Sequence, residues 1–262
     1  RTPDDRPAVV PSSAGDSSWK AALSLLLGLA LWEAGSRSGL LSAVIFPPPT
    51  RVLARLLEAC ASGSVLRQLS PTLLRFLAGS LAGALLGACA GLLCGFSKPL
   101  DSILRPWIDA TFPLPKIALI PLLMALLGAG ELLSVSLIAI SVFYPMAISI
   151  RNGVLETDPS LLDAARNLGA TRAQVVAKVV LPSLTPYAFT GLHLGLLTGL
   201  ATTIVVELLL SSQGIGRMLW VSGEWLRMDV YYAYIVLLAL TGMLVLFLLR
   251  RAMKRFVPWA VK

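Results

Sequence analysis

The sequence predicts an all-α membrane protein with six transmembrane helices. Of its 262 residues, 56% are hydrophobic and only 14% are charged, whereas about 25% of the residues are charged in an average soluble domain. The apolar residues gather into long runs, each able to cross the hydrocarbon core of a bilayer as a helix. Short segments rich in proline, glycine or charge separate these runs. The chain is therefore too apolar for a soluble protein.

Six apolar runs supply the predicted spans. The first run, residues 21–32, follows three basic residues and alone would be similar to a signal-peptide core, but no small-residue cleavage site follows it. Residues 1–18, rich in Pro, Ser and Asp, predict a flexible N-terminal arm, and residues 19–262 predict the transmembrane domain. The expected spans are residues 19–36, 71–96, 107–127, 131–150, 186–210 and 229–250, with a loop at residues 151–185.

The connections between the spans differ in character. Three consecutive prolines at 47–49 predict a turn. Residues 51–61 then place apolar and charged side chains on opposite faces, which is typical of a helix lying along the membrane surface. Residues 97–105 predict a short polar turn, and residues 211–229 predict a polar connection that contains two glycines.

The second span carries a regular series of glycines. One glycine occurs at every fourth residue, so the series follows one line along the helix. Small residues at this spacing let another helix approach closely, which is how membrane helices associate. No Lys-Ser or Lys-Thr pair follows them, so a phosphate-binding loop is excluded. We expect this span to lie at the centre of the bundle and to pack through Gly79, Gly83, Gly87, Gly91 and Gly95.

The third span contains three prolines, Pro113, Pro115 and Pro121, and one lysine, Lys116. The prolines predict a kinked or partly unwound helix, and irregular backbone at membrane depth is tolerated only where protein or a cavity surrounds it. Lys116 has two interpretations. It is either a cation beside the route of an anionic solute or a lysine that extends its ammonium to the cytoplasmic interface.

The fifth span carries His193 and Glu207. Glu207 can gate a pathway or cap the end of a helix, and His193 can line that pathway or pack between helices. For Glu33 and Arg75, at membrane edges, a structural role is the simpler explanation. A single histidine excludes a multi-histidine metal site within one chain, and the three cysteines have no ligand-type neighbours, so we expect no metal and no cofactor.

The loop between the fourth and fifth spans is the longest polar interruption in the second half of the chain. Asp158 before Pro159 predicts the start of a helix, and Gly169 predicts its left-handed C-cap. Thr171 and Gln174 have the spacing of a capping box that starts a second helix. The first helix carries one apolar stripe, formed by Leu161, Ala164, Ala165 and Leu168. An amphipathic helix of this kind between two spans is suited to docking on a partner.

The same loop contains a spaced motif. Asp-Ala-Ala at 163–165 is followed after three residues by Gly169 and, after nine more, by Val179, Leu181 and Pro182. This motif resembles the signature loop of permease subunits of bacterial ATP-binding-cassette (ABC) importers. That loop reads Glu-Ala-Ala, three residues, Gly, nine residues, Ile, one residue, Leu-Pro. The chain departs from it only by Asp for Glu and Val for Ile, which are both chemically close.

The resemblance implies a function and a set of partners. It implies a fold like that of type I ABC importer permeases, with a coupling helix that inserts into a groove on a cytoplasmic ATPase subunit, and with no catalysis by the permease itself. The implied partners are two ATPase subunits, a second permease copy forming a homodimer, a periplasmic or lipid-anchored solute-binding protein and the lipid bilayer. The implied ATPase-coupling residues are Asp163, Ala164, Ala165, Arg166, Asn167, Leu168, Gly169, Ala170 and Thr171.

Three further stretches resemble the importers of nitrate, aliphatic sulfonates and taurine. They are residues 46–58, 113–131 and 205–220. This resemblance implies that the solute is small and anionic. Residues 126–128 read Leu-Leu-Gly where such permeases usually have Trp-Phe-Gly. A thiamine-pyrimidine precursor or another small organic solute is therefore the alternative.

The distribution of Lys and Arg predicts the orientation in the membrane. The net charge is +8, and more basic residues fall on the side of the N-terminus than on the opposite side. The positive-inside rule then places both termini and the 151–185 loop in the cytoplasm of a bacterium, with the spans in its inner membrane. The basic residues lie between and after apolar runs rather than on one stripe, so we expect no nucleic-acid partner.

Two other classes of function remain open on the sequence. An intramembrane serine protease would pair a buried serine with His193, but the chain has no Gly-x-Ser-x-Gly motif and no carboxylate placed to orient the ring. Full activity of a His193→Ala variant would exclude it. A passive channel would not need a cytoplasmic docking helix, and uptake that persists without ATP would favour it.

Overall fold

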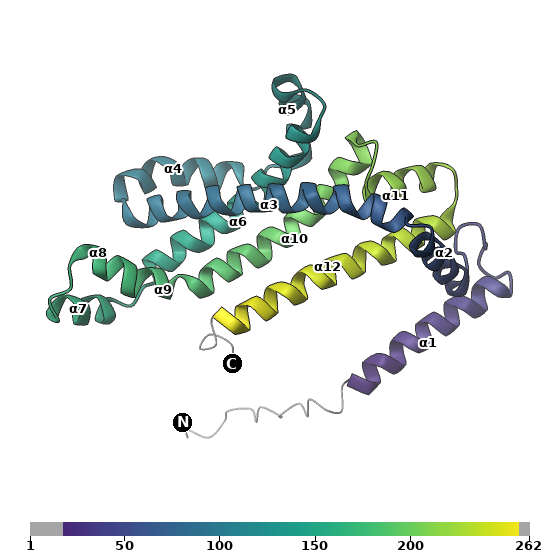
Figure 1. The fold of residues 1–262 in the computed structure, drawn as a ribbon, viewed down its shortest axis with the longest axis horizontal. Helices are drawn as coiled ribbons and strands as arrows, with labels where there is room; N and C mark the ends of the chain where they lie inside the picture. Colours follow the sequence, from purple (N-terminus) through teal and green to yellow (C-terminus); the bar gives the residue numbers. More distant parts are fainter. Residues whose placement is uncertain (1–17, 257–262) are drawn as a thin grey trace, which may run out of the picture.

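The computed structural model describes residues 18–256, and every regular element in that range is a helix (Figure 1). The predicted N-terminal arm, residues 1–18, lies outside the described residues except for Ser18, where the first helix begins. The elements are α1 (Ser18–Arg37), α2 (Pro49–Ala61), α3 (Ser64–Phe96), α4 (Lys98–Thr111), the 3₁₀ helix η1 (Lys116–Leu119), α5 (Ile120–Leu127), α6 (Glu131–Leu155), α7 (Pro159–Asn167), α8 (Arg172–Val175), the π-helix η2 (Val176–Val180), α9 (Leu181–Ser183), α10 (Thr185–Leu210), α11 (Ile215–Glu224) and α12 (Met228–Phe256).

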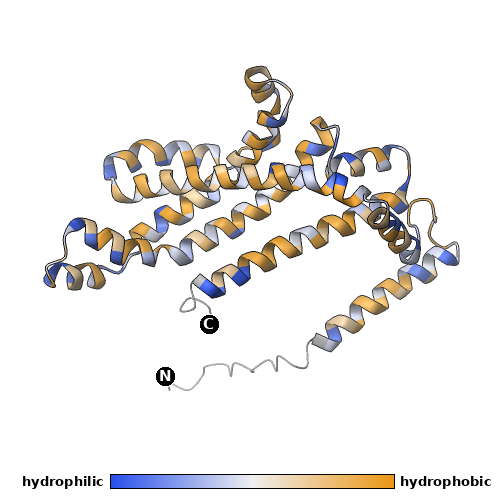
Figure 2. Cartoon of the chain, viewed as in Figure 1, coloured by the Kyte–Doolittle hydropathy of each residue, from blue (hydrophilic) through white to orange (hydrophobic). Residues whose placement is uncertain are grey.

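Four helices within residues 18–256 are long and apolar enough to cross a membrane: α3, α6, α10 and α12. α4 and the segment η1–α5 make a fifth span only when they are counted together, because their directions differ by 102°. α1 is not among these helices. Figure 2 shows apolar residues along the four long helices and polar residues gathered around α7 and α8. The described residues therefore give four or five candidate spans, and six remains a prediction.

α6 is the most deeply buried of the long helices, and it packs against both α3 and α10. Of its most apolar 18-residue stretch, 56% is buried, against 33% for α3 and 33% for α10. α3, the second predicted span, contacts α2, α4, α6, α10 and α11, and its central position stays a prediction. Glycines on α3 and on α10 both face α6, so α6 receives a closely packed helix on two sides.

The glycine series of α3 lies in direct contact with α6. A Cβ built on Gly87 would lie 2.5 Å from the carbonyl oxygen of Phe143, and one built on Gly91 would lie 2.5 Å from that of Ala147. A larger side chain at these positions would push the two helices apart. The residues that meet α6 in this way are Gly79, Gly83, Gly87, Gly91 and Gly95.

α10 carries a second glycine series that the sequence analysis did not single out. Gly191, Gly195 and Gly199 also recur at every fourth residue, and Cβ atoms built on them would lie within 3.0 Å of Ser149 or Val142 of α6. The same four-residue spacing as in the second span predicts this series as well.

The third predicted span is broken, as its prolines predict. α4 ends at Thr111, and Pro113 and Pro115 separate it from η1 and α5, which run in a different direction. In Figure 1 α5 stands away from the bundle formed by the four long helices. Proline removes a backbone hydrogen-bond donor and restricts the residue before it, so two prolines close together interrupt the helix.

Two segments predicted as polar connections are largely helical. Residues 97–105 fall mostly in α4, whose start is capped by the hydroxyl of Ser97. Residues 211–229 contain α11, in which Ile215 and Leu219 lie four residues apart and are both buried. In each case the polar composition of the segment concealed an amphipathic helix.

The helix expected at residues 51–61 is present as α2, but it begins within the predicted proline turn. Pro48 is the N-cap residue of α2, and Pro49 is its first residue. Proline suits the first helical position because its missing N–H would have no partner there.

Candidate functional site

α7 and α8 form a helix–turn–helix between α6 and α10 (Figure 1). Asp158 caps the start of α7, since its Oδ1 accepts a hydrogen bond from the N–H of Ser160 at 2.8 Å. This bond favours the ionised carboxylate and holds the pKa of Asp158 below its ordinary value. The predicted N-cap is confirmed.

Gly169 ends α7 in the left-handed conformation, with φ of 78°. Its N–H donates to the carbonyl oxygen of Arg166 at 2.9 Å, and the N–H of Ala170 donates to that of Ala165 at 3.0 Å, which is the Schellman pattern. No described atom lies within 4 Å of a Cβ built on Gly169. The predicted C-cap is confirmed, and the glycine is required by its backbone angle rather than by crowding.

The second helix of the loop also starts as predicted. The N–H of Thr171 donates to the side-chain oxygen of Gln174 at 2.9 Å, and the N–H of Gln174 donates to the Thr171 hydroxyl at 3.3 Å. These two bonds form the predicted capping box. α8 then continues through η2 and α9 towards α10.

The apolar stripe of α7 is uncovered in the single chain. Leu161 is exposed, Leu168 is 88% exposed, and α7 contains no buried residue. A cavity of about 540 Å³ lies beside α7 and is lined by Arg166 and Arg172 among apolar side chains. The nine predicted ATPase-coupling residues, 163–171, therefore lie together on α7 and on the turn to α8.

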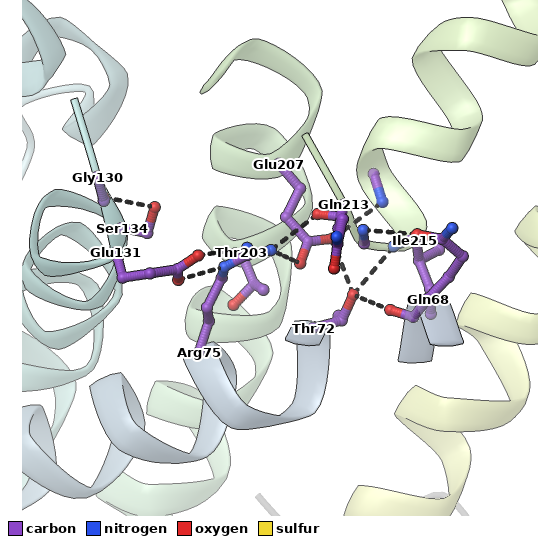
Figure 3. A network of polar contacts seen from close by, with 12 residues as sticks. Gln68, Thr72, Arg75, Gly130, Glu131, Ser134, Thr203, Glu207, Gln213 and Ile215 are labelled. Carbon is purple, nitrogen blue, oxygen red and sulfur yellow. Dashed lines mark hydrogen bonds and ion pairs between the residues drawn. The ribbon is translucent and has the colours of Figure 1, made fainter. Parts of the chain in front are cut away.

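A second polar site lies inside the bundle, near the N-terminal end of α6 and therefore at the opposite end of α6 from α7. The side chain of Arg75 is only 7% exposed. Its Nε and Nη2 donate to the two carboxylate oxygens of Glu131 at 2.6 Å each, and its Nη1 donates to Glu207 at 2.8 Å. Figure 3 shows the guanidinium between the two carboxylates. One arginine of α3 therefore binds both α6 and α10.

Glu207 is fully buried, whereas the side chain of Glu131 is 69% exposed. Besides its bond with Arg75, Glu207 accepts hydrogen bonds from the hydroxyl of Thr72 at 2.9 Å and from the N–H of Gly216 at 3.0 Å. A buried carboxylate is tolerated when it is paired and hydrogen-bonded in this way. Glu207 thus joins α10 to α3 and to the start of α11.

Arg75 and Glu207 were each candidates from the sequence, but their pairing was not predicted. The signal that could have found the pair is their opposite charge within two apolar spans, since charges inside a membrane protein usually bind one another. Glu131 gave no such signal, because it is the first residue of α6 and lies at the edge of its apolar run.

Lys116 lines a cavity of about 340 Å³ formed by the broken span, α6 and α10. Its Nζ donates to the carbonyl oxygen of Phe112. The same atom lies 5.2 Å from the centre of the Phe112 ring and 4.8 Å from that of the Tyr144 ring, within cation–π range. The ammonium is therefore held by the carbonyl oxygen and ring of Phe112 and by the ring of Tyr144.

His193 lies in a different place from Lys116. It lines a separate cavity of about 320 Å³ with Thr190 and Arg250, and Glu207 is part of neither cavity wall. The three predicted pathway residues are therefore not brought together. No serine of the described chain lines the His193 cavity, so the serine–histidine pair of an intramembrane protease finds no support. Within residues 18–256, no group of His, Cys, Asp and Glu side chains is placed to hold a metal ion.

The known proteins similar to this chain are all described as membrane components of transport systems. The family described as "Binding-protein-dependent transport system inner membrane component" matches residues 83–262. The chain is 33% identical to the taurine transport system permease protein TauC of Escherichia coli (strain K12), over 88% of this chain and 86% of that protein. It is 30% identical to the putative aliphatic sulfonates transport permease protein SsuC of Bacillus subtilis (strain 168), over 88% and 84%.

The fold is similar to that of a chain in the MetNI methionine ABC transporter, solved in inward facing conformations. The TM-score is 0.65 at 21% identity, and the match covers 74% of this chain and 96% of that chain. At this identity the likeness shows the fold alone. The family match, in contrast, spans more than half of the sequence. The chain therefore belongs to the binding-protein-dependent transport system inner membrane components, which are permease subunits of ABC importers and not enzymes themselves.

Proposed function

We propose that this chain forms the membrane pathway for a small anionic solute and that α7 is its coupling helix, which docks on a cytoplasmic ATPase subunit. The observation that carries the proposal is α7 itself. It is capped at both ends, by Asp158 and by Gly169. Leu161 and the C-cap residue Leu168 are exposed, whereas Leu162 on its other face packs against the bundle. A helix that keeps its shape without being buried in its own chain is suited to fill a groove on another protein.

The connections of α7 explain how motion of an ATPase reaches the pathway. α8, η2 and α9 lead from α7 to α10, and a short turn leads back to α6. α6 and α10 both line the cavity that contains Lys116. When the ATPase pair closes on ATP, displacement of α7 moves these two helices and switches the access of the cavity from one side of the membrane to the other.

The working assembly contains more than one chain. Two permease copies form a homodimer, two ATPase subunits bind their two α7 helices, and a solute-binding protein delivers solute on the opposite side of the membrane. The exposed Leu122 and Leu126 on the projecting helix α5 support contact with a second copy. α1 and the broken span complete six spans. The termini and α7 lie in the cytoplasm of a bacterium, and the spans lie in its inner membrane.

The solute is a small anion of the sulfonate class. Two relatives are named for taurine and for aliphatic sulfonates, which both carry a sulfonate group. Lys116 supplies a positive charge in the cavity wall, which favours an anion. A thiamine-pyrimidine precursor or another small organic solute is the second candidate.

The polar residues inside the bundle have different roles in this proposal. Lys116 lies on the route of the solute. Arg75 and Glu207 hold α3, α6, α10 and α11 together at the end remote from α7. His193 lines a cavity of its own and has no part in the route.

Transport by the assembled importer tests the proposal. Proteoliposomes that contain the permease, its ATPase subunit and its binding protein are expected to accumulate a radiolabelled sulfonate only when ATP is supplied. Hydrolysis of ATP should rise when the loaded binding protein is added. Uptake that continues at the same rate without ATP would identify a passive channel and would overturn the proposal.

A further inference from the structure

We infer that the cavity beside Lys116 binds the solute itself and selects an alkyl anion, a sulfonate on an apolar body, over a zwitterion that also carries an ammonium group. The inference rests on the proposed function, because it names the kind of solute that the proposed pathway takes. The solute inferred for this chain therefore differs from taurine, the amino-sulfonate for which one of its relatives is named.

One wall of the cavity carries a positive charge with free donors. A lysine ammonium has three N–H donors, and within the described residues only the carbonyl oxygen of Phe112 accepts one from Lys116. The remaining donors can bind sulfonate oxygens. The rings of Phe112 and Tyr144 restrict the position of the ammonium, and η1 holds Lys116 against α6 and α10.

The rest of the wall is mainly apolar. Five aliphatic side chains, Ile117 and Ile120 on the broken span, Leu137 on α6, and Val205 and Val206 on α10, line the cavity. An alkyl chain placed against them is removed from water, which is favourable in proportion to the area covered. The volume of about 340 Å³ falls within the range of about 300–1,000 Å³ that is usual for small-molecule sites.

Two hydroxyl groups can add to the anion site. The hydroxyls of Ser141 and Thr202 lie 2.8 Å apart across α6 and α10, and both line the cavity. Each also has a backbone carbonyl acceptor within its own helix, Leu137 for Ser141 and Thr198 for Thr202. Each hydroxyl has one proton, so the hydroxyl that donates to a sulfonate oxygen gives up one of these bonds. The carbonyl oxygen that it leaves still accepts the backbone N–H four residues further along its own helix.

The cavity offers no counterion for an ammonium group. No carboxylate lines it among the residues that the structure describes. The acidic residue that follows Val206 on α10 is Glu207, and its carboxylate is already held by Arg75 and Thr72. An ammonium inside the cavity would meet hydroxyl oxygens but no carboxylate, and it would be repelled by Lys116. An alkyl group in the same position avoids both costs.

Two probes of nearly equal size test this selectivity. Propane-1-sulfonate differs from taurine by a methyl group in place of the ammonium, so it isolates that group. The full-length permease, purified with its ATPase subunits, is titrated with each probe by isothermal calorimetry. We expect propane-1-sulfonate to bind at least about tenfold more tightly than taurine, which corresponds to about 1.4 kcal/mol. Equal or tighter binding of taurine, or binding of neither probe, overturns the inference.

Substitutions at Lys116 test the location of the site. We expect Lys116→Gln to weaken binding of propane-1-sulfonate at least tenfold, whereas Lys116→Arg keeps the charge and stays within a few-fold of the original chain. His193→Gln is the matched control, because His193 lines a separate cavity, and it should bind normally. A folded Lys116→Gln protein that binds as tightly as the original chain would place the site elsewhere and overturn the inference.

A gain of function gives a test that does not depend on lost binding. Ala201 lines the same cavity, and Ala201→Glu adds the missing counterion. We expect this variant, if its melting temperature is unchanged, to shift the affinity ratio towards taurine by at least tenfold, and an unchanged ratio counts against the inference.

Coupled ATP hydrolysis is measured on the same complexes. If hydrolysis stays coupled while the titrations fail, the inference is wrong and the proposed function stands. If coupling itself is absent, the proposed function fails.

Discussion

Arg75 joins three helices because its guanidinium presents donors in more than one direction. Two nitrogens bind Glu131 and a third binds Glu207. The sequence shows that these charges lie in or near apolar spans. It does not show that they meet, because short-range sequence patterns do not specify contacts between three separate helices. Lys116 shows the same limit. Phe112 precedes it by only four residues in the chain, whereas its second ring, Tyr144, comes from a different span.

Removal of Arg75 should destabilise the bundle strongly. Arg75→Met leaves the buried carboxylate of Glu207 without its cation, and loss of one partner of a buried ion pair costs about 3–5 kcal/mol. Arg105→Met is the control, because Arg105 pairs with Asp109 on the exposed surface of α4, where a pair contributes about 0–1 kcal/mol. Thermal unfolding of the purified protein compares the two. Equal melting temperatures would contradict a structural role for the Arg75 network.

The Asp158 cap predicts a pH dependence at the start of α7. The N–H of Ser160 holds the pKa of Asp158 below its ordinary value of 3.8, so the cap contributes stability above that value and loses it as the pH falls through the lower, folded-state pKa. Hydrogen exchange of the Ser160 amide, corrected for intrinsic rate, should show protection that is lost only below about pH 4. Asp158→Asn, which still caps, should keep protection there. Loss of protection near neutral pH would contradict the cap.

Individual elements were predictable where their determinants are local. The N-cap, the glycine C-cap and the capping box of α7 and α8 each involve residues within five positions of one another, and all are present. α11 was missed because its apolar residues, Ile215 and Leu219, lie in a segment of polar composition and are buried only by contact with other helices. The direction of α5 after the proline break also depends on tertiary contacts.

The contact between α3 and α6 has a glycine at five points of close approach. Gly87→Leu would place its side chain against the backbone of Phe143, and overpacking of this kind costs about 1–3 kcal/mol or prevents folding. Gly28→Leu on α1 is the control, since no described atom lies within 4 Å of a Cβ built there. Size-exclusion chromatography and thermal unfolding should show loss of folded protein for Gly87→Leu alone. Normal behaviour of both variants would contradict the packing.

Substitutions of Gly169 should be tolerated or not according to whether the new residue adopts a positive φ, and not according to the size of its side chain. Gly169→Val forces a β-branched residue into the left-handed region, at a cost of about 1–2 kcal/mol, and should uncouple ATP hydrolysis from uptake while the protein still inserts into the membrane. Gly169→Asn, which tolerates this conformation, should remain coupled. Uptake and hydrolysis in proteoliposomes measure both. Full coupling of Gly169→Val would show that α7 does not act as a rigid lever.

At the scale of the whole molecule, hydropathy located the long helices and their order, because a membrane span is specified by one continuous stretch of sequence. The arrangement of the helices could not be obtained in that way. α6 is buried between two glycine-lined helices, and the Lys116 cavity is formed by three segments distant in sequence. The proposed coupling therefore depends on one contact in the assembly, that of α7 with the ATPase subunit.

Association of the ATPase with two matched variants tests this contact most directly. Leu168 at the C-cap of α7 and Leu40 between α1 and α2 are 88% and 86% exposed, so Leu168→Asp and Leu40→Asp should both fold normally. We expect Leu168→Asp to lose co-purification with the ATPase subunit and to lose coupled ATP hydrolysis, because an unpaired charge would enter an apolar contact. Leu40→Asp should keep both. Retention of the ATPase by Leu168→Asp at the level of Leu40→Asp would contradict the account.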